Sequence, residues 1–200
     1  VENTSVGRVL FNEFVPKELG YVNELISKKS LRTIIGKVIK KCGIPRSAQF
    51  LDDIKNMGYY MAFRGGLSFN LDAVVIPESK QKLVNEGYEK ADAIMEDYNM
   101  GLITNNERYN QIIDVWTNVN NKLTKEVVDT LTKDQDGFNP VYMMLDSGAR
   151  GSREQIRQLS GMRGLMADTT GRTIELPIKS NFREGLDVLE YFMSAHGARK

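Results

Sequence analysis

The side chains most able to do chemistry are four arginines in the segment SGARGSREQIRQLSGMRGLMA (residues 147–167), which contains only one acidic residue. They are Arg150, Arg153, Arg157 and Arg163. Glycines recur among them and leave stretches of backbone that other groups can approach closely. Planar guanidinium groups beside bare backbone suit phosphate oxygens, so the segment predicts an anion-binding site. A second basic group follows at Arg183, Arg199 and Lys200.

The arginines are predicted to lie at the start of a helix, because Ser152 and Gln155 have the spacing of an N-cap residue and its partner. Backbone N–H groups at such a helix start favour an anion. Arg150 and Arg157 are seven residues apart, about two helical turns, so they are predicted to lie roughly on one side of this element. Two interpretations stay open for them: contact with phosphate, or structural pairing with an acid. The candidate acids are Asp146, Glu154 and Asp187.

A complete catalytic constellation is absent from the sequence. His196 is the only histidine and Cys42 the only cysteine, which excludes an internal disulfide, a cysteine-based zinc site and a Cys–His pair. No P-loop and no G-x-S-x-G motif occurs, and no tight aspartate cluster could hold two magnesium ions. The DQDG sequence at 134–137 lacks the later ligands of a calcium loop, so we expect a turn. On its own, the chain is not expected to be an enzyme.

The first third of the chain predicts two helices. Residues 28–42 place an apolar face opposite lysines, and Gly43 is a plausible stop. Pro45 suits the first turn of a second helix at about 46–64, which RGG at 64–66 ends. Residues 67–77 (LSFNLDAVVIP) are predicted to be extended chain or a short strand.

The middle of the chain predicts an antiparallel coiled-coil hairpin at about 78–133. Apolar residues recur at spacings of three and four from Val84 to Tyr98 and from Tyr109 to Leu123, and Thr104 with Glu107 forms a capping box between them. Residues 78–136 carry 7 basic and 12 acidic side chains, so the hairpin is acidic outside. Two interpretations remain open: a helical pair packed flat on a larger core, or a protruding docking handle.

A short extended segment (172–178) and a helix starting at Asn181, capped with Glu184, complete the prediction. The fold class is therefore mainly α with short β segments. The composition, 41% hydrophobic and 26% charged, is that of an ordinary soluble folded protein, and no apolar stretch reaches the roughly 20 residues that span a bilayer. Because the last helix has no C-terminal stop, we expect the chain to be a piece of a longer polypeptide.

Several motifs together resemble the β′ subunit of bacterial DNA-directed RNA polymerase. They are SGARGSREQIRQLSGMRGLMA, IELPI followed by NFREGL, VLEYFMSAHGARK, VGRVLFNEFVP, FRGG, LSFNLDAVVIPE and NERYNQIIDVW. The resemblance covers essentially all 200 residues. It implies a partial pore region at 1–65 and a funnel at 66–145 whose rim helices form the hairpin. It further implies an F-loop region at 146–180 and the start of the bridge helix at 181–200.

The resemblance also implies roles for individual residues. Arg150 and Arg157 match arginines placed near the incoming triphosphate. Met162, Arg163 and Met166 match the F-loop, and His196, Arg199 and Lys200 match the start of the bridge helix. The tip of the hairpin matches a docking site for secondary-channel factors, at Asp97, Asn99, Gly101, Asn105 and Glu107.

As the resemblance has it, the parent complex is a nucleotidyltransferase that uses Mg²⁺ and also holds Zn²⁺, while this chain lacks the catalytic aspartate motif and should be inactive alone. Implied partners are the β, α, ω and sigma subunits, template DNA, RNA, nucleoside triphosphates and factors of the Gre and DksA type. The implied location is the bacterial cytoplasm at the nucleoid, without membrane contact. Two other hypotheses are a stand-alone helical adaptor that presents a coiled-coil tip to protein partners, and an independent nucleic-acid-binding module.

Overall fold

The computed structural model describes residues 3–199, and the side chains within this range up to residue 195. The chain divides into two compact units. One extends to Ser68 and includes Ser147–Ala149, and the other comprises Phe69–Asp146 and the chain from Arg150 onward. Helices dominate both units, as predicted. In the described part of the chain, no helix is long and apolar enough to cross a membrane.

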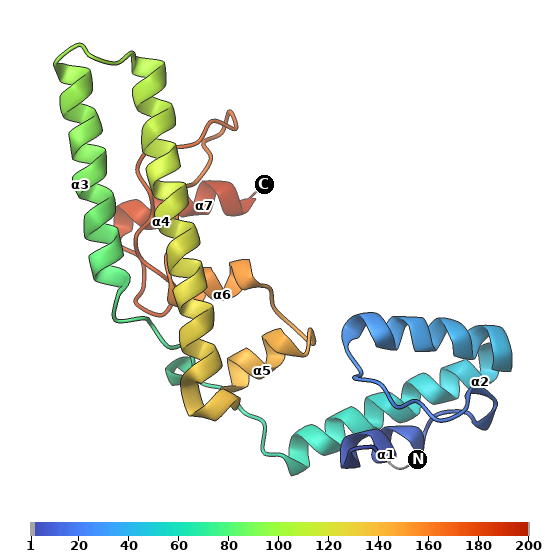
Figure 1. Ribbon diagram of the computed structural model, residues 1–200. Helices are drawn as coiled ribbons and strands as arrows, with labels where there is room; N and C mark the ends of the chain where they lie inside the picture. Colours follow the sequence, from blue (N-terminus) through green and yellow to red (C-terminus); the bar gives the residue numbers. More distant parts are fainter. Residues whose placement is uncertain (1–2, 200) are drawn as a thin grey trace. The chain divides into compact units, whose positions relative to one another are not determined.

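The first unit contains α1 (Val6–Asn12), the short η1 (Lys17–Leu19) and α2 (Lys28–Arg64). Gly43 interrupts α2 with φ of +76°, and Figure 1 shows α2 folding back on itself there. The predicted helix stop at Gly43 is thus confirmed, because only glycine adopts this conformation at no steric cost. The two arms enclose a core in which the Phe11 and Phe50 rings meet edge to face at 6.4 Å.

The second unit is built on α3 (Lys80–Asn99) and α4 (Asn105–Lys133), which lie side by side as an antiparallel pair in Figure 1. Thr104 caps α4 by accepting from the Glu107 N–H at 3.2 Å, as predicted. The buried face of α4 continues from Ile112 through Leu131, and the Tyr88 ring meets Trp116 edge to face at 4.9 Å. The helical pair is observed, and its description as a coiled coil stays a prediction.

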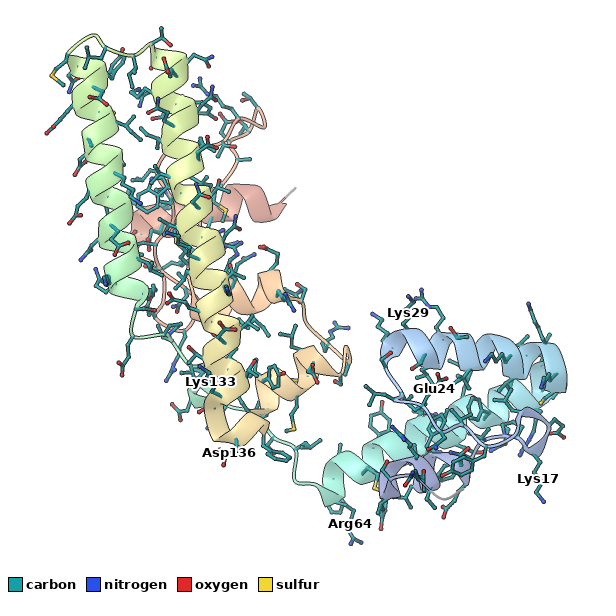
Figure 2. All side chains as sticks on the ribbon, viewed as in Figure 1. Lys17, Glu24, Lys29, Arg64, Lys133 and Asp136 are labelled. Carbon is teal, nitrogen blue, oxygen red and sulfur yellow. The ribbon has the colours of Figure 1, made fainter. Side chains whose placement is uncertain are left out.

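Three shorter elements contact α4: η3 (Asp134–Gly137), α5 (Pro140–Asp146) and α6 (Arg153–Ser160). The unit also contains η2 (Leu71–Ala73) and α7 (Val188–Arg199). Figure 2 marks the turn from α4 toward α5 with Lys133 and Asp136, and this turn is η3, where DQDG was expected to turn.

The expected short strands are not formed in the described residues. Segment 67–77 contains η2 in place of a strand, since Asn70 caps it by accepting from the Ala73 N–H at 3.0 Å. Segment 172–178 makes only isolated antiparallel bridges, in which Gly164 pairs with Ile178 and Ala167 with Thr173.

The last helix begins at Val188, seven residues later than predicted from Asn181. The predicted Asn181–Glu184 cap exists, with the Glu184 N–H donating to Asn181 Oδ1 at 2.8 Å, but it closes only one turn. Gly185 then adopts φ of +86° and ends that turn. A second capping pair starts α7, because the Glu190 N–H donates to Asp187 Oδ1 at 2.7 Å.

Candidate functional site

The glycine-flanked turn before α6 presents Arg150 to solvent. Gly151 has φ of +92°, and Ser152 and Gln155 form the predicted reciprocal cap, with the Ser152 N–H donating to Gln155 Oε1 at 3.0 Å. Arg150 therefore precedes the helix, and the helical spacing predicted to align it with Arg157 does not apply. No hydrogen bond or ion pair engages the Arg150 guanidinium in the described part of the chain, so its donors are available to an anion.

Arg157 is in the opposite situation, because it is only 6% exposed and its guanidinium is bound within the fold. Nη1 donates to Asn120 Oδ1 and to the carbonyl oxygens of Met162 and Arg163, each at 2.8 Å. Nε and Nη2 both donate to Glu154 Oε2, at 3.0 and 2.6 Å. Of the two interpretations left open for Arg157, the structure shows pairing with an acid, Glu154. This arginine joins α6, α4 and the chain that leaves α6.

Arg163 is half-buried and stacks its guanidinium over the Phe182 ring at 4.8 Å. Its Nε donates to Gln158 Oε1 at 3.2 Å. Burial, and after it the positive charge of Arg157, lower the pKa of Arg163 below its usual value. Arg153 instead borders a separate polar hollow over α4, together with Lys125 and Asp129. The four arginines therefore do not form one cluster.

The segment from Met162 to Ser180 is the later part of the expected F-loop region (146–180), and it lies along α4. Met162 is fully buried in the core of the second unit, and Met166 is half-buried. Near the start of α4, the Arg108 guanidinium donates two hydrogen bonds to the Glu175 carboxylate, of 2.5 and 2.9 Å.

Tyr109 adds a second attachment for the same segment. Its hydroxyl donates to the Thr173 carbonyl at 2.9 Å, and Arg172 lies over its ring at 4.6 Å. These contacts supplement the backbone bonds within the segment itself, in which the Gly164 and Ile178 N–H groups donate to each other's carbonyl oxygens.

The end of the α3–α4 pair carries the predicted docking residues on or beside one short loop. Asp97 and Asn99 lie in the last turn of α3, and Gly101, with φ of +78°, turns the chain. Asn105 and Glu107 lie in the first turn of α4, and Asn105 Oδ1 accepts from Arg108 Nη2 at 2.9 Å. Acidic groups from both helices are thus brought to one end of the pair.

The predicted bridge-helix residues fall at the end of the described chain. His196 and Arg199 lie within α7, whose side chains are described only up to residue 195, and Lys200 lies outside the described residues. The part of α7 that is described exposes large apolar side chains. They are Val188, Leu189, Tyr191 and Phe192.

A metal centre is not formed by the described residues, since no three His, Cys, Asp or Glu side chains gather there. The side chains present therefore do not fit the magnesium or zinc that the resemblance implies for the parent subunit.

Sequence reasoning missed the polar groups that hold this site together. Asn181 is fully buried and its amide donates to the carbonyls of Ser160 and Gly161, both at 3.1 Å. Asn120 accepts a hydrogen bond from Arg157, which is 37 residues away in the sequence. Arg108 donates to Glu175, which is 67 residues away. The only signal in the sequence was an amide residue next to apolar positions. Such a signal does not identify the group with which the amide forms its hydrogen bond.

Comparisons with known proteins identify relatives of the chain. Residues 103–183 match the family model described as RNA polymerase Rpb1, domain 4. The DNA-directed RNA polymerase subunit beta′ of Parabacteroides distasonis is 68% identical across 98% of this chain, and that of Flavobacterium johnsoniae 59% across 98%. The chain spans only 14% of the length of either relative. The resemblance to an internal region of bacterial β′ subunits is therefore confirmed.

Proposed function

We infer that this chain, which is similar along nearly its whole length to an internal region of bacterial RNA polymerase β′ subunits, serves as part of the catalytic subunit of a DNA-directed RNA polymerase. The observation that carries this inference is the 68% identity across 98% of the chain. The parent enzyme would join nucleoside triphosphates on a DNA template in the bacterial cytoplasm, at the nucleoid. Its other subunits (β, α, ω and sigma) would be the partners of this region.

Within that enzyme we propose that the chain lines the secondary channel, through which nucleotides enter and backtracked RNA leaves. Residues 1–65 would be the partial pore region, 66–145 the funnel with its rim helices, 146–180 the F-loop region and 181–200 the start of the bridge helix. The α3–α4 pair and the segment fixed along α4 support this assignment. The catalytic magnesium would be held by a part of the parent subunit outside this chain, and any zinc likewise.

We propose that Arg150 contacts the triphosphate of the incoming nucleotide. Its guanidinium is exposed on a glycine-flanked turn, whereas the donors of Arg157 are used inside the fold. Because phosphoryl transfer depends mainly on positioning and on neutralising charge, one such arginine acts on nucleotide affinity. Arg157 would lie near the same triphosphate while its guanidinium holds α6 to α4 and to the chain that leaves α6.

Replacing Arg150 by alanine in the full-length polymerase should raise the apparent KM for nucleotides roughly tenfold or more, since a hydrogen bond to a charged group contributes about 1.5–3 kcal/mol. The measurement is the single-nucleotide addition rate as a function of nucleotide concentration. Arg153→Ala is the matched control, because Arg153 borders the other hollow. Unchanged addition at limiting nucleotide would remove Arg150 from the phosphate site.

We also propose that the tip of the α3–α4 pair is the docking site for secondary-channel factors of the Gre and DksA type. Double charge reversal, Asp97→Lys with Glu107→Lys, should weaken such a factor about fivefold or more at low salt, because two attractive charges become repulsive. The measurement is factor-stimulated transcript cleavage against factor concentration, with factor-free transcription as the reference. Glu89→Lys, also exposed on α3 but outside the tip, is the control. An unaltered factor titration in the tip variant would contradict the assignment.

The adaptor hypothesis differs in where the tip would act. A stand-alone adaptor would bind its partners through the tip without any polymerase, and the comparisons provide no support for it. A test is co-purification of the chain with core polymerase subunits when it is expressed within its parent reading frame.

A further inference from the structure

A cavity of about 730 Å³ lies in the second unit, lined by α5, α6 and the chain around η2. Its inner wall is apolar and tightly packed, since Val74, Val141 and Ile156 are each at most 6% exposed. Its rim carries large apolar side chains that remain uncovered: Phe69 and Leu71 are 68% and 69% exposed, and Phe182 is 49% exposed. The volume falls in the range of about 300–1,000 Å³ that is typical of pockets for small organic molecules.

The cavity has one charged group, the Arg150 guanidinium. The oxygen atoms of the other polar side chains in the lining accept bonds within the fold: Gln155 Oε1 from the Ser152 N–H, Gln158 Oε1 from Arg163, and Asn70 Oδ1 from the Ala73 N–H. A ligand in this cavity would therefore find an apolar wall and, at Arg150, a single charged donor. A charge-assisted bond to that donor is roughly twice as strong as a bond between neutral groups.

We propose that this cavity binds a small organic anion, with an aromatic or branched aliphatic body and one carboxylate, sulfonate or phosphate group. The body packs against Val74 and Ile156, with the Phe69 and Phe182 rings at its edge, and the anionic group bonds to Arg150. Aromatic side chains at the rim favour a flat ring in the ligand. Every lining residue belongs to the second unit.

The test uses two probes with the same rings, titrated into the chain and followed by fluorescence. One is 8-anilinonaphthalene-1-sulfonate, and the other is N-phenyl-1-naphthylamine, which lacks the sulfonate. Saturable binding of the anionic probe at one site is expected. Arg150→Gln should weaken the anionic probe roughly tenfold or more, as expected for loss of a bond to a charged group, and leave the neutral probe unchanged. Leu71→Asp at the rim should weaken both probes.

Two control variants separate this cavity from other surfaces. Arg153→Gln removes a nearby guanidinium that does not line the cavity, and Phe192→Ser removes an exposed apolar side chain from α7. Neither should change the titrations. Equal weakening by Arg150→Gln and Arg153→Gln, or loss of binding in Phe192→Ser with no effect of Leu71→Asp, would overturn the proposal. Circular dichroism of each variant verifies that the helices are retained. The two proposals have separate tests. Absence of probe binding would not contradict a raised nucleotide KM in the Arg150→Ala polymerase, and an unchanged KM would not contradict probe binding.

Discussion

Replacing Arg157 by methionine is expected to lower the free energy of unfolding of the chain by about 2–5 kcal/mol, because polar groups inside the protein lose their hydrogen-bond donor. The substitution keeps most of the apolar stem and removes all five guanidinium hydrogen bonds. The carbonyl oxygens of Met162 and Arg163 lose a donor inside the protein, where each unsatisfied group costs about 1–3 kcal/mol. Glu154 loses less, since its side chain is 68% exposed and water can replace the arginine. The measurement is chemical denaturation followed by circular dichroism.

The matched control for this experiment is Arg153→Met, four residues earlier on the same helix. Arg153 is exposed and borders only a surface hollow, so a change within about 0.5 kcal/mol is expected, as is usual for surface substitutions. An Arg157→Met chain as stable as the Arg153→Met chain would show that the buried network does not stabilise the fold. In that event structural pairing would not explain why this arginine is buried, and phosphate contact would remain as the other interpretation.

The contrast between Arg150 and Arg157 shows where sequence reasoning succeeds and where it stops. The caps at Ser152 and Thr104 and the break at Gly43 were predictable, because each depends on residues within four positions. The burial of Arg157 was not, since Asn120 comes from a different helix. The segment 172–178 was predicted to be extended. Backbone bonds pair it with the residues just before it, as between Gly164 and Ile178, and side chains on α4 also hold it.

The start of α7 was mispredicted for a related reason. Two capping pairs follow one another in the sequence, at Asn181–Glu184 and at Asp187–Glu190, and local chemistry does not rank them. The tertiary structure decides between them, because the buried Asn181 amide donates to two carbonyl oxygens at the end of α6. A helix continuing directly from Asn181 would require Gly185 to give up its left-handed conformation.

The sequence analysis did not single out Gly87, because a search for apolar residues does not include glycine. Substitution of Gly87 is nevertheless expected to have the second large effect on stability. A Cβ atom at this position would lie 2.8 Å from Trp116 Cζ3 and 3.1 Å from Val119 Cγ2. The Trp116 ring is 2% exposed and is held edge to face by Tyr88, so it has little room to move. Gly87→Ala should therefore destabilise the chain by about 1–3 kcal/mol through overpacking, outweighing the roughly 1 kcal/mol that alanine gains over glycine within a helix.

Gly58 provides the opposite expectation for the same substitution. It lies inside α2, and a Cβ atom there would meet nothing within 4 Å. Gly58→Ala should accordingly stabilise the chain by up to about 1 kcal/mol. The double variant Gly87→Ala with Trp116→Phe should lose less stability than the two single changes combined, because the smaller ring leaves space for the new methyl group. Strictly additive losses in that cycle, measured by chemical denaturation, would mean that close approach of α3 to the Trp116 ring is not what requires glycine at position 87.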